Sequence, residues 1–163
     1  KHQERLSLIQ NKLLKGYAST VNSIEQLEIL IEQSRLLLSS NKIKEQKATL
    51  QRFIENQNQL LLFKQAELFY SNKSYLESAE RLISIKESNK NLIFSSSLLE
   101  KSGNLENKLI DIFHEQAIIH YRNQELPEAL KLWEIISLLQ PDNILAIKYI
   151  QRTNKLIKKL NEY

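Results

Sequence analysis

Apolar residues recur every three or four positions along most of this sequence, the spacing that places side chains on one face of an α-helix. The first run predicts a helix over residues 3–38 and consists of Leu6, Ile9, Leu13, Tyr17, Val21, Ile24, Leu27 and Ile31. Gly16 lies within this run, and Ser23 with Gln26 offers a capping box that would start a new helix. Because the apolar positions keep their phase across this stretch, we expect one continuous helix.

Ser39-Ser40-Asn41 ends the first helix, and a second apolar run follows from Ile43 to Tyr70. Two long helices joined by a short turn predict an antiparallel hairpin. Pairing them about residues 40–42 makes every layer apolar but one: Ile31 with Leu50, Leu27 with Ile54, Val21 with Leu60, Leu13 with Leu68, and Ile24 with Gln57. We therefore expect a hairpin over residues 1–59 whose second helix continues to about residue 71.

Shorter helical segments fill the rest of the chain. Asn72-Lys73 ends the second long helix, and Ser74 with Glu77 forms a capping box that opens the next one. Gly103-Asn104 predicts a C-terminal stop. The helices expected after residue 71 cover residues 75–87, 92–102, 105–123, 126–139 and 144–160.

The composition also favours an all-α protein. The 163 residues include two Gly and two Pro, far fewer turn formers than a β-rich fold or a phosphate-binding loop needs. The sequence has no run of eighteen apolar residues that would predict a membrane-spanning helix. We therefore expect an all-α fold in which the hairpin of residues 1–59 leads into a helical region over residues 60–163.

The sequence contains neither cysteine nor methionine. The lack of cysteine excludes disulfides, thiolate catalysis and cysteine zinc sites. The lack of an initiator methionine indicates a processed or trimmed piece of a longer chain. On both grounds we expect an anchored or exported fragment from a bacterial cell envelope, with membrane contact only through segments outside this sequence.

Residues 117–143 contain small, aromatic and proline positions at fixed offsets. Ala129 lies twelve positions after Ala117, Trp133 four after that, and Pro141 eight further on. The alanines let two helix backbones approach, the indole fills the volume beyond them, and the proline ends the second helix. This pattern resembles the tetratricopeptide repeat, a helix–turn–helix unit of about 34 residues that stacks into arrays.

A second, partial version of the pattern occurs earlier in the chain. Ala66 is followed twelve positions later by Ser78, and Leu82 stands where the aromatic residue would be, with no closing proline. Ala66 and Ala117 are 51 positions apart, seventeen more than the family repeat. The excess falls around residues 88–104, so either the intervening helix is an insertion, or the helix over residues 105–123 is extended and the short helix packs under it.

The resemblance implies a non-catalytic scaffold or adaptor that presents a groove to a peptide or helix of a partner protein. In this family the first helix of each unit lines the groove. By position, the lining residues here are Phe63, Glu67, Tyr70, Asp111, His114, Ile118, Tyr121, Arg122, Leu145, Lys148, Arg152 and Lys155. The carboxylate-binding version of the family has Lys and Asn where this sequence has His114 and Ile118, so we do not carry that specificity over.

The sequence predicts no catalytic, cofactor or metal site. His114 and His120 come nearest to a zinc-binding helix, but they are six positions apart and point about 240° from each other. We expect His120 to pack half-buried instead. The serines lie at helix ends or in Ser95–Ser97, without the strained glycine turns that present a nucleophile.

Lys148, Arg152, Lys155 and Lys159 are spaced four, three and four, so they form one basic stripe on the last predicted helix. The stripe is either a solvated face, a docking site for an acidic peptide, or a nucleic-acid contact. Because the charge is confined to one helix, nucleic acid is the less favoured partner. A further alternative is a purely structural component whose hairpin self-associates through leucines such as Leu36–Leu38.

Overall fold

The computed structural model describes residues 23–39, 47–88 and 96–162. Every secondary-structure element within these residues is an α-helix, so the predicted all-α class is confirmed for them. The helices are α2 (Ile24–Leu38), α3 (Lys47–Ser71), α4 (Tyr75–Ser88), α5 (Ser96–Arg122), α6 (Leu126–Leu139) and α7 (Ile144–Asn161). Among them, none combines the length and the apolar character that crossing a membrane requires.

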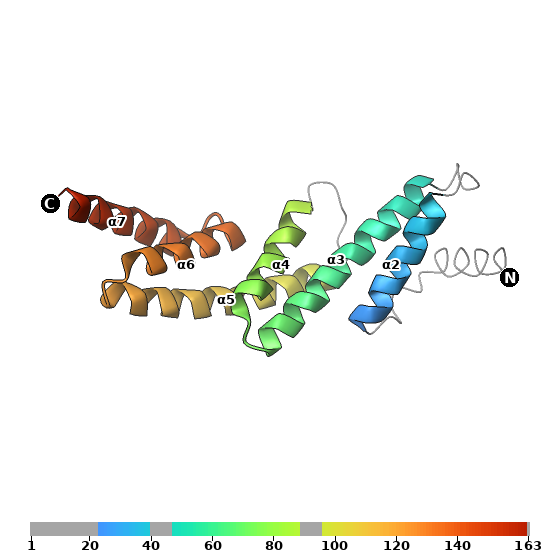
Figure 1. Ribbon diagram of the computed structural model, residues 1–163, viewed down its shortest axis with the longest axis horizontal. Coiled ribbons are helices and arrows are strands. Elements are labelled where there is room, and N and C mark those ends of the chain that lie inside the picture. The colour runs from blue at the N-terminus through green and yellow to red at the C-terminus, as the bar shows by residue number, and fades with distance from the viewer. Residues whose placement is uncertain (1–22, 40–46, 89–95, 163) are drawn as a thin grey trace.

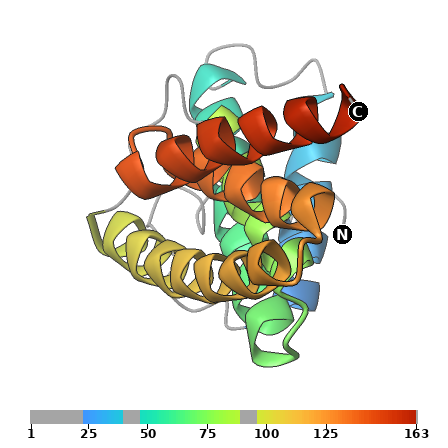
Figure 2. The ribbon, with the colours of Figure 1, turned by 90° about the vertical axis from the view of Figure 1, so that its left-hand side faces the viewer.

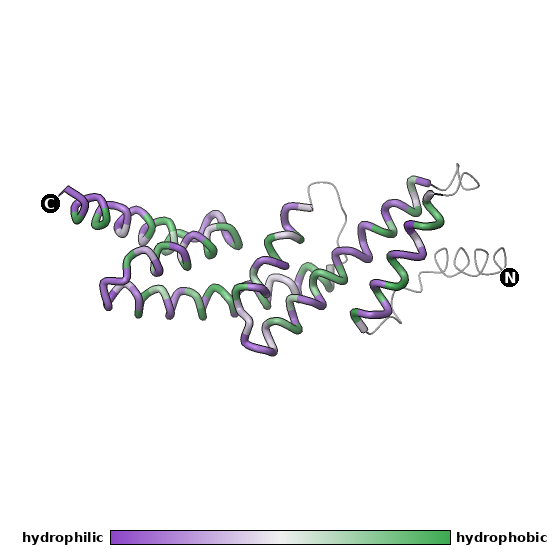
Figure 3. Tube along the Cα trace, in the orientation of Figure 1, coloured by the Kyte–Doolittle hydropathy of each residue, from purple (hydrophilic) through white to green (hydrophobic). Residues whose placement is uncertain are grey.

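The helices follow one another along an elongated molecule, with α2 near one end and α7 at the other (Figure 1). From the C-terminal side, α5, α6 and α7 are stacked in layers (Figure 2). Hydrophobic and hydrophilic residues alternate along the helices (Figure 3). The buried hydrophobic residues form a main core that extends from Phe63 of α3 to Ala146 of α7.

Helix α2 begins at Ile24, so the prediction of one continuous helix over residues 3–38 is wrong at Ser23. Ser23 is the N-cap, with an extended backbone (φ −115°, ψ 151°), and its hydroxyl accepts a hydrogen bond from the backbone N–H of Gln26 at 3.2 Å. A serine that caps a helix in this way stabilises the helix start by about 1 kcal/mol. The capping signal at Ser23 therefore outweighs the unbroken apolar phase. The rest of the predicted helix, within residues 1–22, lies outside the described residues.

Helix α2 packs on the first half of α3. Ile31 and Leu37 of α2 and Leu50 and Ile54 of α3 form a second buried cluster, separate from the main core. Gln57 of α3 is also buried, and its side-chain oxygen makes no hydrogen bond to any described residue. Gln57, the polar residue in the predicted apolar layers, thus has an unsatisfied side-chain oxygen among the described residues.

Helix α5 runs through Gly103, so the predicted stop at Gly103-Asn104 is wrong. The residues on either side, Ser102 and Leu105, are buried against neighbouring helices. A glycine in a helix interior costs about 1 kcal/mol, and burial of the flanking residues offsets that cost. The described part of the short helix expected over residues 92–102 forms the first turns of α5. The first helix of the second pair is therefore extended, but residues 96–102 belong to it and do not pack under it as a separate helix.

The turns α3–α4 and α5–α6 have the same backbone geometry. Each contains one residue in the left-handed conformation, Lys73 with φ 62° and Gln124 with φ 65°. In both turns the following residue donates its N–H to the carbonyl five positions back at 2.9 Å. The left-handed residues donate to the carbonyls three positions back at 3.0 and 3.2 Å. These bonds form the Schellman motif, which usually has glycine at the left-handed position.

The helix boundaries around these turns repeat with one offset. Three of the four boundaries of the second helix pair lie 51 positions after their counterparts in the first: Arg122 after Ser71, Leu126 after Tyr75, and Leu139 after Ser88. The starts of α3 and α5, at Lys47 and Ser96, are 49 positions apart. The predicted ranges of α4, α6 and α7 agree with the structure to within one residue at each end. The two pairs α3–α4 and α5–α6 are therefore equivalent in their local construction.

Small side chains lie where the paired helices cross. Ala66, Ala117 and Ala129 are fully buried, as is Ser78, which stands in the first pair where Ala129 stands in the second. The hydroxyl of Ser78 donates a 2.8 Å hydrogen bond to the backbone carbonyl of Ala66. Serine is therefore small enough for α3 and α4 to pack closely, and its hydroxyl adds one hydrogen bond between the two helices.

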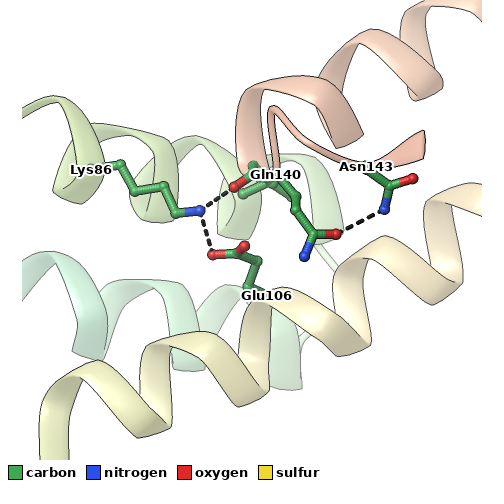
Figure 4. Close-up of polar contacts among 5 residues, drawn as sticks. Lys86, Glu106, Gln140 and Asn143 are labelled. Carbon is green, nitrogen blue, oxygen red and sulfur yellow. Dashed lines mark hydrogen bonds and ion pairs between the residues drawn. The ribbon is translucent and has the colours of Figure 1, made fainter. Parts of the chain in front are cut away.

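One lysine joins three helices at the centre of the molecule (Figure 4). The ammonium of Lys86 in α4 lies 2.7 Å from the carboxylate of Glu106 in α5 and donates to the last carbonyl of α6, that of Leu139. A cation at a helix C-terminus is favoured by the partial negative charge there. Asn143 lies in the turn between α6 and α7. Its side-chain amide donates to the Gln140 side chain at 2.8 Å, and its side-chain oxygen caps α7 by accepting from the N–H of Ala146 at 3.0 Å.

Candidate partner-binding face

An aromatic cluster holds the C-terminal helices together. Trp133 of α6 is fully buried, and its indole N–H donates to Nδ1 of His114 in α5 at 3.4 Å. Tyr149 of α7 stacks on the indole, with ring centroids 4.6 Å apart and an angle of 13° between the planes. Tyr121 of α5 meets the indole edge to face at 5.7 Å. Trp133 is thus enclosed by side chains from α5 and α7.

Tyr149 fastens α7 to α5 as well as to α6. Its ring lies 5.6 Å from the imidazole of His114 and 6.2 Å from the ring of Tyr121, both edge to face. Aromatic pairs in such geometries contribute about 0.5–1.5 kcal/mol each beyond their buried area. The cluster therefore fixes the orientation of α7, and with it the direction in which the rest of that helix points.

Helix α7 has one buried side and one basic side. Ala146 and Thr153 are buried against the molecule, whereas Lys148, Arg152 and Lys155 are exposed. Consecutive helical residues are about 100° apart, so these three cations fall within about 60° of one another. The sequence of α7 contains five Lys and Arg and no Asp or Glu.

Tyr121 of α5 connects the basic side of α7 to the neighbouring helix. The guanidinium of Arg152 lies 5.8 Å from the centre of the Tyr121 ring. This cation–π contact orients an exposed side chain that would otherwise be flexible. The attraction between the guanidinium and the ring offsets the conformational entropy that the side chain loses. Arg152 is therefore held at the boundary between α5 and α7, with its remaining N–H groups free to donate outward to a carboxylate.

Exposed leucines accompany these charges. Leu145 is 54% exposed and Leu156 is 37% exposed, and both lie on the side of α7 that carries Tyr149 and Arg152. On α5, Ile118 is half-buried, and Asp111 and Arg122 are exposed. We call the following set the α5–α7 face: Ile118, Tyr121, Arg122, Leu145, Lys148, Arg152, Lys155 and Leu156.

His114 is part of the aromatic cluster beneath this face, because its ring nitrogen accepts from Trp133. It supports the face and is itself half-buried. His120, which the sequence places in a packing position, is half-buried and lies 2.5 Å from Oε2 of Glu125 in the α5–α6 turn. Within the described residues, no group of three or more His, Asp or Glu side chains is arranged to hold a metal ion.

The candidate residues of the first helix pair do not belong to the α5–α7 face. Phe63 is 3% exposed and is part of the main core, so its side chain is not accessible to a partner. Tyr70 is half-buried beside Lys108, whose ammonium is 5.9 Å from the ring centre. Glu67 is exposed and pairs with Lys64 at 3.3 Å. Figure 1 shows that α3 and α7 are separated along the long axis of the molecule.

The sequence analysis did not include Tyr149 or Leu156 among the binding residues. The signal is present, since Leu145, Tyr149, Arg152 and Leu156 are spaced four, three and four and share one side of α7. The basic stripe occupies overlapping positions of the same helix, and it predicts a charged contact without showing the apolar residues beside it. No family model matches this chain, and neither the curated proteins nor the solved structures contain a match to it.

Proposed function

We propose that this chain is a non-catalytic protein-interaction module whose α5–α7 face binds an acidic helix or peptide of a partner protein. The observation that carries the proposal is the position of Arg152, which is exposed and held against Tyr121 between two leucines. Charged hydrogen bonds to a carboxylate are about twice as strong as neutral ones. Apolar contacts next to such bonds favour an amphipathic partner over a free anion.

We propose further that α3–α7 form a tetratricopeptide-like array into which a hairpin of α2 and α3 leads. Three observations support this arrangement: the 51-residue offset shared by three of the four helix boundaries, the matching turns, and the buried alanines of the paired helices. In such an array α7 would be the first helix of an incomplete third unit. Its exposed side would then continue the surface that α5 begins.

A partner protein fits the face better than nucleic acid does. Nucleic-acid sites combine a wide basic field with aromatic rings that are free to stack on bases. Here Tyr121 and Tyr149 are half-buried and pack against each other and Trp133. The face also includes Leu145 and Leu156, which have no role in contacting phosphates.

The proposal is tested by fluorescence anisotropy with a labelled helical peptide that carries Glu and Leu at spacings of three and four. We expect the double variant Lys148→Glu, Arg152→Glu to bind the peptide at least tenfold more weakly than the wild type. Lys47→Glu, Arg52→Glu is the matched control, because it makes the same charge change at exposed positions of α3. Equal weakening by both pairs would show only a dependence on net charge and would reject the face.

A salt titration separates the two classes of ligand. Between about 50 and 200 mM salt we expect a change in peptide affinity of only a few fold, since part of the contact is apolar. A protein that makes six to ten phosphate contacts loses about 10³–10⁵ in affinity over this range. Tight, strongly salt-dependent binding of a single-stranded oligonucleotide, with no binding of the peptide, would replace our proposal with nucleic-acid binding.

A further inference from the structure

The outer side of α2 presents apolar residues to solvent. Ile29 is 51% exposed and Leu36 is 64% exposed, and the two lie seven positions apart, on the side opposite the buried residues Leu27 and Ile31. About half or more of each side chain is therefore accessible to solvent. An amphipathic helix that is apolar on its outer side, with charged neighbours, is a feature of interaction surfaces.

The charges beside these apolar residues are mostly negative. Glu25, Glu28 and Glu32 are exposed on α2 at spacings of three and four, and Arg35 is the only cation of that helix. The pair that Arg35 makes with Glu32 has an N–O distance of 3.8 Å between side chains that are more than half exposed. Such a pair contributes little and does not prevent Glu32 from facing another cation.

The outer side of α2 is complementary to the α5–α7 face. Three carboxylates at spacings of three and four can lie opposite Lys148, Arg152 and Lys155, which have the same two spacings. In the antiparallel register that pairs these charges, Leu36 of α2 lies next to Leu145, whereas Ile29 falls opposite Gln151 and does not reach Leu156. The charged side chains of each helix give α2 a net charge of −2 and α7 a net charge of +5.

We propose that the α5–α7 face binds α2 of a second copy of this chain. The inference rests on the proposed function and names its partner. Pairing within one chain is excluded by the shape of the molecule, because α2 and α7 lie toward opposite ends (Figure 1). Each copy therefore offers one α2 to one neighbour and one α5–α7 face to another, which is a head-to-tail interface that builds rings or open chains.

The test uses two variants of the whole chain, each with one half of the interface reversed in charge. Glu28→Lys, Glu32→Lys disables α2, and Lys148→Glu, Arg152→Glu disables the face. By light scattering coupled to size exclusion, we expect the wild type to increase in mass with concentration and each variant alone to remain monomeric. An equimolar mixture is expected to regain the concentration-dependent mass of the wild type, because the unchanged α2 and the unchanged face bind each other and the two reversed halves also carry opposite charges.

Two controls address folding and specificity. Combining all four substitutions in one chain restores opposite charges and should restore assembly, which an unfolded variant could not do. Glu77→Lys, Glu80→Lys makes the same charge change at exposed positions of α4 and should leave assembly unchanged. Circular dichroism is expected to show the same helix content in every variant.

The possible results distinguish a failure of this inference from a failure of the proposed function. A wild type that stays monomeric up to millimolar concentration overturns the inference, as does assembly that persists when the α5–α7 face is reversed. If the monomeric wild type still binds the acidic peptide, the proposed function stands and only the identity of the partner is wrong. If neither peptide nor second copy binds, both proposals fail.

Discussion

The ring of Tyr149 lies nearly parallel to the indole of Trp133, 4.6 Å away between centroids. This contact covers the only tryptophan of the chain, and the covering side chain comes from the last helix. The state of Trp133 therefore reports whether α7 is seated on α6. The environment of Trp133 therefore also measures how the aromatic cluster holds α7 in place, and no ligand is needed.

We expect Tyr149→Ala to destabilise the protein by about 2 kcal/mol and to shift the tryptophan emission to the red. Truncating a fully buried aromatic residue costs about 3–5 kcal/mol, and Tyr149 is half-buried. Chemical denaturation and the emission spectrum measure both effects. Tyr149→Phe keeps the ring and should change neither; an unshifted spectrum for Tyr149→Ala would show that α7 is held by other contacts.

We expect Lys86→Met to destabilise the protein by about 1–2 kcal/mol. The substitution leaves Glu106, whose side chain is 11% exposed, without its cation, and it removes the contact with the end of α6. The estimate is reduced because the Lys86 side chain is 40% exposed. The double variant Lys86→Met, Glu106→Leu should recover most of the loss. Purely additive effects in this double-mutant cycle would contradict a coupled pair.

We expect Gln124→Gly to stabilise the protein by about 0.5–1 kcal/mol. Gln124 has φ 65°, a conformation in which a residue with a Cβ is strained and glycine is not. Thermal unfolding measures the change, and Lys73→Gly in the equivalent turn should behave alike. Asn123→Gly, at the preceding position, is the control and should not stabilise. A lower unfolding temperature for Gln124→Gly would show that its side chain makes a contact worth more than the strain.

We expect Gln57→Leu to stabilise the protein by about 1 kcal/mol. Gln57 is a buried residue of α3, and its carbonyl oxygen has no hydrogen-bond partner among the described residues. Replacing an unsatisfied polar group by an apolar one of similar size removes that penalty. Gln51→Leu, on the exposed side of α3, is the matched control and should be neutral. A loss of stability for Gln57→Leu would mean that the amide is satisfied in solution.

Much of the helix plan follows from local signals in the sequence. The polar turn at Asn72-Lys73 and Pro141 mark helix ends that the structure reproduces, because each acts within a few residues. Trp133 is buried, as its place sixteen positions after Ala117 and four after Ala129 suggests. These features depend on the spacing within one helix pair.

The two errors arise where a local signal competes with packing. At Ser23 the helix cap interrupts an apolar pattern that keeps its phase, and at Gly103 the buried residues on either side keep the helix intact through a glycine. The stack of Tyr149 on Trp133 depends on how α7 is oriented across α6, which periodicity does not determine. The burial of Phe63 likewise follows from the neighbouring helices α4 and α5, and no spacing within α3 shows it.

The elongated arrangement has a consequence for how the chain folds and opens. The described helices pack chiefly on their neighbours in sequence, so most native contacts close short loops. Low contact order of this kind favours folding in microseconds to milliseconds. It also lets either end open while the middle stays ordered, so amide hydrogen exchange should be slowest in α5 and α6 and fastest in α2 and the last turns of α7.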